Sequence, residues 1–192
     1  MSDGAAVIGE DGRARCPWGA AQPDYIAYHD QEWGFPLRGE PELYERITLE
    51  SFQSGLSWLT ILRKRPAFRE AFASFDPAAV ARFGEDDRQR LLADASIVRN
   101  RAKVDAAITN ARAVLELDQP LDDLLWSFAP PPRPDSERPV KLGDVPAITD
   151  ESKAMAKELK RRGFVFVGPT TCYALMQATG MVDDHLKDCW RA

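Results

Sequence analysis

Apolar side chains recur at helical spacing around position 50, and one carboxylate lies among them. Leu43, Ile47 and Glu50 follow one another at the spacing of a single helix face. Phe52 makes another face apolar as well, so this helix is expected to be buried. Gly55 can end the helix in a left-handed conformation, and a second helix is predicted to begin three residues later. A carboxylate is therefore expected inside an apolar helix pair.

Most of the remaining chain shows the same periodicity, interrupted by glycine, proline and short polar caps. Ser57, Asp76 and either Thr149 or Asp150 are predicted N-caps. Five prolines between residues 130 and 139 require a non-helical crossing, and residues 164–167 are too few to make a sheet. The sequence predicts an all-α fold, with helices over residues 41–54, 58–65, 66–75, 77–83, 86–95, 100–117, 121–128, 150–162, 170–179 and 182–190.

The composition is that of a folded globular protein. The chain has 192 residues, of which 44% are hydrophobic, enough for one domain with a substantial core. No apolar run is long enough to span a membrane, and residues 1–15 lack the apolar segment of a signal peptide. We expect a cytoplasmic monomer with no membrane partner. Residues 1–15 are predicted to be a flexible tail, and residues 16–192 a single helical domain.

The net charge of −5 argues against a generally basic nucleic-acid-binding protein. Basic side chains nevertheless cluster at residues 63–69, 99–112 and 153–162. Each cluster alone is most simply a solvated helix face, although three of them beside apolar helices favour phosphate contacts. Residues 95–103 are predicted to be a short turn between two helices. Such a turn is either an ordinary helical hairpin or one whose backbone N–H groups face a phosphate.

Cysteine and histidine side chains near both ends of the chain form a metal-ligand set. Cys16 and His29 lie near the beginning, and His185 and Cys189 lie four residues apart near the end. Two thiolates and two imidazoles are typical of a closed tetrahedral zinc site, which would be structural. Ordinary packing would explain any one of these residues alone. Cys172 is left as a core thiol, and no signal peptide accompanies the cysteines, so disulfides are not expected.

Aromatic side chains are concentrated before residue 34. Trp18, Tyr25, Tyr28 and Trp33 lie within one short stretch. They are either an apolar cover over the core or a cage for a planar, positively charged ligand. Glu50 has two interpretations as well. It either caps a backbone group or pairs with an arginine, or it accepts hydrogen bonds from a flat ligand on which Trp58 stacks.

Longer motifs resemble those of the 3-methyladenine DNA glycosylase I family. The match extends from about residue 16 to residue 189, and its motifs are long and in order, so it is specific. It is carried by Cys16-Pro-Trp-Gly, the run from Asp24 to Gly34, Leu49-Glu50 with Gln53, Gly55-Leu-Ser-Trp58, Phe75-Asp-Pro, the run from Arg99 to Lys103, Leu125-Trp-Ser-Phe128, Arg162-Gly-Phe-Val-Phe-Val-Gly168, and Asp184-His185 with Cys189.

The resemblance implies a helix-hairpin-helix glycosylase fold in which residues 95–103 hold the DNA backbone. It implies one structural zinc ion, bound by the four cysteine and histidine residues named above. It also implies a surface for double-stranded DNA containing alkylated bases. The residues expected to contact DNA are Gly55, Leu56, Ser96, Arg99, Arg101 and Lys103.

The reaction that the resemblance implies is hydrolysis of the N-glycosidic bond of 3-methyladenine. The product is the free base, and the DNA keeps an abasic site without strand cleavage. The nucleotide must first leave the base stack. The methylated base is cationic and leaves readily, so Glu50 is expected to recognise its exocyclic amine rather than to act as a general base. The implied pocket consists of Glu50 and Tyr28 as catalytic residues and Trp18, Tyr25, Trp33 and Trp58 as substrate-binding residues.

The sequence departs from the family pattern at two places. Ser96 and Ala102 stand where the family favours glycine, which affects the phosphate contact. Ser51 and Phe52 stand beside Glu50 where the family has a smaller and a polar residue, which puts the back of the pocket in doubt. Two alternatives to an enzyme remain: a zinc-stapled protein that binds alkylated bases without excising them, and a helical structural protein whose aromatics belong to the core.

Overall fold

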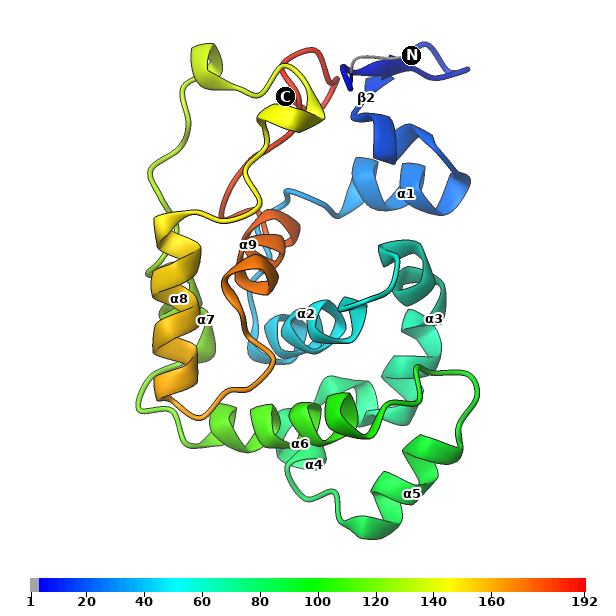
Figure 1. Ribbon diagram of the computed structural model, residues 1–192, viewed down its shortest axis with the longest axis vertical. Helices are drawn as coiled ribbons and strands as arrows, with labels where there is room; N and C mark the ends of the chain where they lie inside the picture. The colour runs from blue at the N-terminus through cyan, green and yellow to red at the C-terminus, as the bar shows by residue number, and fades with distance from the viewer. Residues whose placement is uncertain (1–3) are drawn as a thin grey trace.

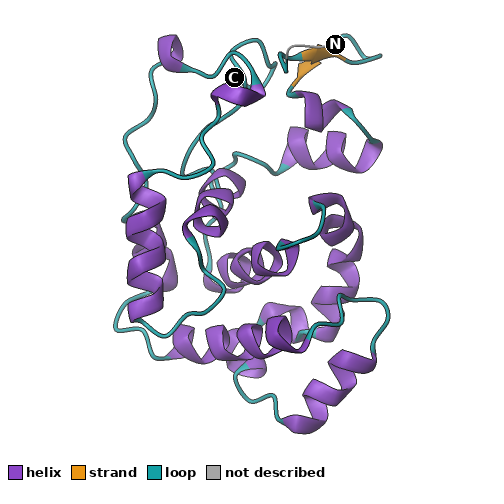
Figure 2. Ribbon diagram, viewed as in Figure 1, coloured by secondary structure: helices purple, strands orange, loops and turns teal. Residues whose placement is uncertain are grey.

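Helices make up nearly all regular structure in the computed structural model, which describes residues 4–192 (Figure 2). The α-helices among these residues are α1 (Pro23–Gln31), α2 (Glu40–Gln53), α3 (Trp58–Ala71), α4 (Pro77–Val80), α5 (Glu85–Ala93), α6 (Arg101–Leu115), α7 (Leu121–Trp126), α8 (Asp150–Arg161) and α9 (Pro169–Ala178). Short 3-10 turns are η1 (Pro17–Ala20), η2 (Ala73–Phe75), η3 (Asp135–Glu137) and η4 (Leu142–Asp144). None of the helices within 4–192 has the length and apolar character to cross a membrane.

Helix α2 lies near the middle of the molecule (Figure 1), where it packs against α3, α6, α7 and α9. Its apolar side chains are almost completely buried, including Leu43, Ile47 and Phe52. Burial on several faces is the expected consequence of an apolar pattern that extends beyond one stripe. The prediction of a buried helix here is confirmed, and the Glu50 side chain is inside the protein with it.

Three helices begin at the predicted N-cap residues. Ser57 accepts a hydrogen bond from the Thr60 N–H, Asp76 from the Ala78 N–H, and Thr149 from the Ser152 N–H. Each side chain satisfies one of the N–H groups that a first helical turn leaves free. These three N-cap predictions are confirmed, with Thr149 rather than Asp150 as the cap of α8.

Two helix predictions between residues 58 and 83 are wrong. Residues 58–65 and 66–75 were expected as separate helices, but α3 continues through Pro66 to Ala71. Proline removes one helical hydrogen bond, and the fully buried Ile61 and Phe68 on either side stabilise the continuous helix. The helix expected over 77–83 ends at Val80. Helix α1, for which we made no prediction, begins with Pro23 at its first position, which is a typical helix start.

The C-terminal segment does not form the helix predicted over residues 182–190. It is a chain of turns, because its backbone N–H groups bond elsewhere. The Asp183 carboxylate accepts from the His185 N–H, while the N–H groups of Lys187 and Trp190 donate to the carbonyls of Pro139 and Ala14. Side-chain and long-range acceptors have replaced the local helical ones.

The N-terminal segment is ordered where we expected a flexible tail. Strands β1 (Val7–Ile8) and β2 (Ala14–Arg15) pair antiparallel. The Arg15 side chain is buried and hydrogen-bonded to Asp11 and Asp30. These contacts attach to α1 a hairpin that the prediction of a flexible tail did not include. Residues 1–3 of the predicted tail lie outside the described residues.

Candidate functional site

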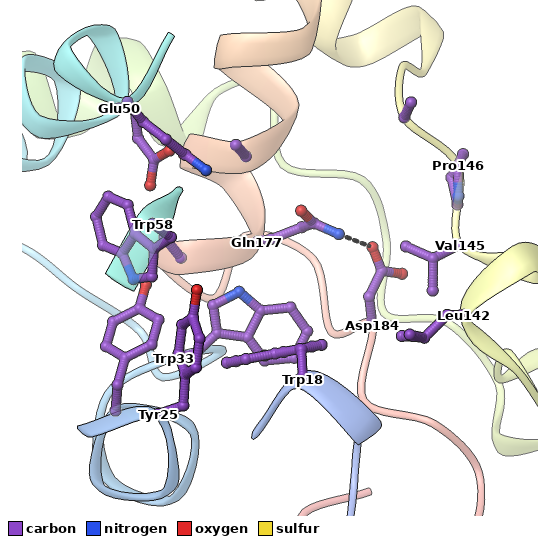
Figure 3. Close-up of a pocket in the computed structure, with 15 residues that line it drawn as sticks. Trp18, Tyr25, Trp33, Glu50, Trp58, Leu142, Val145, Pro146, Gln177 and Asp184 are labelled. Atoms are coloured by element: carbon purple, nitrogen blue, oxygen red, sulfur yellow. Dashed lines mark hydrogen bonds between the residues drawn. The ribbon is translucent and has the colours of Figure 1, made fainter. Parts of the chain in front are cut away.

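A cavity of about 440 Å³ opens between α1, α2, α3, α9 and the segment around η4. All six residues predicted for the base pocket line it: Trp18, Tyr25, Tyr28, Trp33, Glu50 and Trp58 (Figure 3). Gln53, Gln177, Asp184, Ala174, Ala178 and residues 142 and 145–147 complete the wall. Aromatic rings thus face one another across a space suited to a flat molecule.

The aromatic rings brace one another at edge-to-face or tilted angles. The centroid of Trp18 lies 5.0 Å from that of Trp33 and 5.8 Å from that of Tyr25, and Tyr28 lies 5.5 Å from Trp58. The Tyr25 hydroxyl accepts a hydrogen bond from the Leu59 N–H, at the start of α3. Because these rings line a cavity rather than only a core cluster, the cage interpretation is favoured over the apolar cover.

Glu50 is 5% exposed, and its carboxylate points into the cavity (Figure 3). Within residues 4–192 it has no hydrogen-bond or ion-pair partner. The guanidinium of Arg46, one turn earlier, instead donates to the Tyr28 hydroxyl at 3.1 Å and lies 3.7 Å from Glu32. Burial raises the pKa of Glu50 to about 7, and the positive charge of Arg46 opposes the rise only in part. A buried carboxylate without a protein donor favours the ligand-binding interpretation.

Tyr28 is buried beside Glu50, and burial raises the pKa of its hydroxyl, so the phenol is protonated near neutral pH. The hydroxyl accepts from Arg46, and its own proton is free for another acceptor. Ser51 and Phe52 face away from the cavity. Ser51 donates to the Ile47 carbonyl, and the Phe52 ring lies 4.8 Å from that of Phe68. These two departures from the family pattern therefore leave the cavity wall unchanged.

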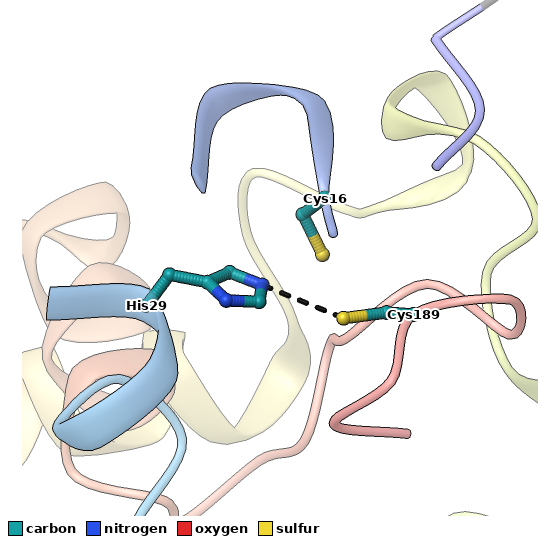
Figure 4. Close-up of side chains that lie close together, drawn as sticks. All are labelled: Cys16, His29 and Cys189. Atoms are coloured by element: carbon teal, nitrogen blue, oxygen red, sulfur yellow. Dashed lines mark hydrogen bonds between the residues drawn. The ribbon is translucent and has the colours of Figure 1, made fainter. Parts of the chain in front are cut away.

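Three of the four predicted zinc ligands meet in a buried cluster (Figure 4). The ligand atoms of Cys16, His29 and Cys189 all lie within 4.8 Å of one another. The contact with the Cys16 thiol, and after it the contact with His29, lower the pKa of the Cys189 thiol, while the same contact raises the pKa of Cys16. Of the two sulfurs, Cys189 is therefore favoured as the thiolate that metals bind. The cluster connects η1, α1 and the C-terminal turns. It lies behind the cavity, since the rings of His29 and Trp18 are in contact at 5.2 Å.

His185, the fourth predicted ligand, stands next to this cluster. Its ring centroid is 5.0 Å from that of His29, and its Nε2 is buried without a hydrogen-bond partner in the described part of the chain. Both imidazoles have their Nδ1 against an aspartate, His29 against Asp30 and His185 against Asp183. A carboxylate on Nδ1 leaves Nε2 as the ligand atom, which is the usual arrangement around protein-bound metals.

Two glycines leave room for the histidine rings. A Cβ at Gly19 would lie 2.4 Å from the His29 ring, and a Cβ at Gly34 would lie 2.7 Å from the His185 ring. Both glycines belong to the motifs that surround the ligands in the sequence. The chain is therefore shaped to bring these rings together.

The residues expected to contact DNA fall into two groups. Gly55 (φ 79°) and Leu56, 41% exposed, follow the end of α2 beside the cavity residues Gln53 and Trp58. Residues 94–100 connect α5 to α6, and Arg99 and Arg101 are exposed there. A short connection between two helices thus lies where the turn was predicted.

Lys103 and Ser96 do not have the free groups that a phosphate contact requires. Lys103 is 7% exposed, and its ammonium donates to the carbonyls of Phe52 and Ser54, where it caps the end of α2. The Ser96 N–H and hydroxyl both donate to Asp94. The backbone N–H groups of residues 97–99 donate to no acceptor among residues 4–192. The polar groups of Lys103 and Ser96 are thus used within the protein, whereas the N–H groups of residues 97–99 are not.

Sequence reasoning gave no role in the pocket to two polar residues of the cavity wall, of which Asp184 was noticed only as part of a motif. Gln177 and Asp184 come from α9 and the turn after it, and the Gln177 amide donates to the Asp184 carboxylate at 2.9 Å (Figure 3). The available signal was a glutamine in an otherwise apolar helix, since Cys172, Leu175 and Met176 are buried. Gln53 was noticed only as part of a motif.

Known proteins resemble this chain over most of its length. The model of the methyladenine glycosylase family matches residues 18–192. DNA-3-methyladenine glycosylase 1 of Escherichia coli (strain K12) is 47% identical over 178 residues, which cover 91% of this chain and 95% of that protein. A crystal structure of 3-methyladenine DNA glycosylase I has a TM-score of 0.87 at 45% identity, covering 92% of this chain and 98% of the other. A single-residue variant of such an enzyme, solved in complex with 3-methyladenine, has a TM-score of 0.85 at 36% identity, covering 92% and 96%.

Proposed function

The chain belongs to the methyladenine glycosylase family, and we propose from this that it excises 3-methyladenine from alkylated double-stranded DNA. The reaction is hydrolysis of the N-glycosidic bond, with release of the free base and an abasic site in an unbroken strand. The observation that carries the proposal is the aromatic cavity with Glu50 buried in its wall and unpaired. The resemblance inferred from the motifs agrees with the family match.

The cavity suits a purine that carries positive charge. The base must be extruded from the duplex to reach Glu50, which lies too deep for a stacked nucleotide. Ring faces such as that of Trp58 attract a cation, and an ionised Glu50 accepts from the exocyclic amine. With the pKa of Glu50 raised to about 7, binding of a cation favours the ionised carboxylate. The cationic base is already a good leaving group, so we assign Glu50 to recognition and to stabilising the positive sugar in the transition state.

The DNA backbone is proposed to bind at the connection between α5 and α6 in the manner of a helix-hairpin-helix motif. Free N–H groups at residues 97–99 suit a phosphate, and Arg99 and Arg101 add positive charge there. Leu56 is placed to enter the gap left by the extruded nucleotide, as apolar side chains do in other DNA-bending proteins. Lys103 is left out of this surface, since its ammonium is used inside the protein.

A structural zinc ion is proposed for the buried cluster, held by Cys16, His29, His185 and Cys189. The donor set is that of a closed site, and the unpartnered Nε2 of His185 supplies the fourth ligand atom. When bound, the ion would supply only folding energy, because four protein ligands leave no position for water. It would connect η1 and α1 to the C-terminal turns behind the aromatic wall.

The test is release of free 3-methyladenine from methylated duplex DNA by the wild-type protein and by Glu50→Gln. We expect release by the wild type and a loss of about 100-fold or more in the variant, since a charged recognition group is removed. Glu45→Gln, on the same helix but paired with Arg69 outside the cavity, is the matched control and should retain activity. If the folded wild type binds methylated duplex DNA without releasing the base, the glycosylase proposal is wrong and the protein that binds alkylated bases without excising them is favoured.

A further inference from the structure

A chain of polar side chains runs behind the cavity wall and reaches the cavity through Gln177. Asp184 is at its centre, with a side chain that has no exposed surface. Its Oδ2 accepts from the Gln177 amide at 2.9 Å and from the Tyr173 hydroxyl at 2.6 Å. Its Oδ1 lies 2.8 Å from the Arg133 guanidinium. The base-excision proposal uses none of these four side chains.

Asp184 determines how the Gln177 amide is oriented. The Gln177 Nε2 donates to Asp184 Oδ2, and the other carboxylate oxygen of Asp184 lies against the Arg133 guanidinium. This hydrogen bond places the amide nitrogen of Gln177 on the side of Asp184, so the carbonyl oxygen Oε1 points the other way. Figure 3 shows this oxygen directed into the cavity, on the side of Glu50. In the described residues no donor reaches it, so a ligand in the cavity would meet an oriented and unpaired acceptor.

Rigid surroundings hold this orientation. Arg133 belongs to the proline-rich crossing, between Pro132 and Pro134, where proline limits the backbone. Gln177 is the penultimate residue of α9, and its own carbonyl accepts from the Gly34 N–H. An acceptor fixed before binding costs little entropy when a ligand arrives.

We propose that Gln177 is a specificity-determining residue that accepts a hydrogen bond from the extruded base, and that Asp184 is the positioning residue that presents its oxygen. This rests on the proposed function and deepens it. The ligand class is an alkylated purine that carries positive charge and N–H donors. Glu50 and Gln177 approach from α2 and α9, so a base that offers acceptors to both would be disfavoured by lone-pair repulsion.

The first experiment compares the wild type with Gln177→Met, which keeps the length of the side chain and removes the acceptor. Single-turnover excision of 3-methyladenine from duplex DNA and quenching of tryptophan fluorescence by added free 3-methyladenine are both measured. We expect excision and base affinity each to fall about tenfold or more. Tyr173→Phe is the matched control: it removes another donor from the same Asp184 oxygen and should leave both values within about twofold of the wild type.

A double-mutant cycle tests the positioning role. In Asp184→Asn the introduced amide can donate to Oε1, so Gln177 loses its fixed orientation. If Asp184 acts through Gln177, adding Gln177→Met to Asp184→Asn should cost no more than about twofold further. A purely structural role for Asp184 predicts that the two losses multiply, and that result would overturn the positioning claim. Circular dichroism establishes folding, and Gln177→Met alone decides the acceptor claim if Asp184→Asn does not fold.

The outcomes separate this inference from the function on which it rests. An active wild type with an equally active Gln177→Met removes Gln177 from recognition and leaves the glycosylase proposal intact. A wild type that releases no base contradicts the glycosylase proposal. In that case the fluorescence titration still measures whether Gln177→Met weakens binding of the free base, and unchanged affinity would overturn the acceptor claim.

Discussion

Replacing Glu50 by glutamine is predicted to stabilise the folded protein at alkaline pH, although it removes activity. The carboxylate is 5% exposed, and no donor bonds it within the described chain. Burial raises its pKa from 4.5 to about 7. The unfolded chain therefore loses the Glu50 proton near pH 4.5, while the folded protein keeps it until about pH 7. Between these values the ionisation of Glu50 favours the unfolded state.

The size of the effect follows from this interval. The difference between 4.5 and about 7 corresponds to about 3.5 kcal/mol, at about 1.4 kcal/mol for each pH unit. Because the cavity is open, solvent can reach part of the charge, and we expect Glu50→Gln to gain about 1–3 kcal/mol in the free energy of unfolding above pH 7. Below pH 4.5 the carboxyl is protonated in both states, and the gain should vanish.

Urea unfolding of the wild type and Glu50→Gln across about pH 5 to 8.5 measures this difference directly. Loss of a bound metal at low pH would affect both proteins and cancels in the comparison. Glu32→Gln is the control of opposite sign. Burial acts to raise the pKa of Glu32, but hydrogen bonds from Arg65 lower it, so its ionised form contributes stability that the variant loses at high pH. A Glu50→Gln gain that does not change with pH would refute the reasoning.

Three further changes test the other parts of the site. Cys189→Ser should lose zinc and several degrees of Tm, because it removes a ligand of the proposed site. Cys172→Ala lies outside the cluster and should keep its metal. Equal zinc contents in the two variants, measured by atomic absorption, would contradict the metal site. Gly55→Ala should lower the free energy of unfolding by about 1 kcal/mol, because the φ of 79° at this position strains any residue with a Cβ. The added Cβ would meet no described atom within 4 Å, so no steric clash contributes. Urea unfolding identical to that of the wild type would disprove this. Leu56→Ala should weaken binding to methylated duplex DNA but not to free 3-methyladenine, because only the duplex has a gap for this side chain to enter. Leu115 is an exposed leucine at the far end of α6, and Leu115→Ala should change neither affinity. An unchanged duplex affinity of Leu56→Ala in fluorescence anisotropy would argue against insertion of Leu56 into the DNA.

Local information was enough to predict much of the helical framework. The apolar spacing around Leu43 and Ile47 produced the buried helix α2, and the capping side chains of Ser57 and Thr149 act on N–H groups only three residues away. Such interactions depend on neighbours in the chain, so a sequence pattern contains them. The aromatic set and the cluster of Cys16, His29 and Cys189 were predictable for another reason. Clustered aromatic residues, and cysteines combined with histidines, serve few functions other than ligand binding and metal binding. The local sequence nevertheless contains nothing that places Cys16 beside Cys189.

Only the tertiary structure decided how the polar groups are used. From the sequence Lys103 is expected to be a surface cation, yet its ammonium is buried and donates to two carbonyls at the end of α2. Residues 182–190 have a helical pattern, but long-range acceptors at Ala14 and Pro139 take their N–H groups. Gln177 acquires an orientation only because the chain after α9 folds back to bring Asp184 beside it, with Arg133 arriving from a distant segment. A hydrogen-bonding group is satisfied by whichever partner the packed chain brings near, and for these groups that partner lies dozens of residues away or on another element.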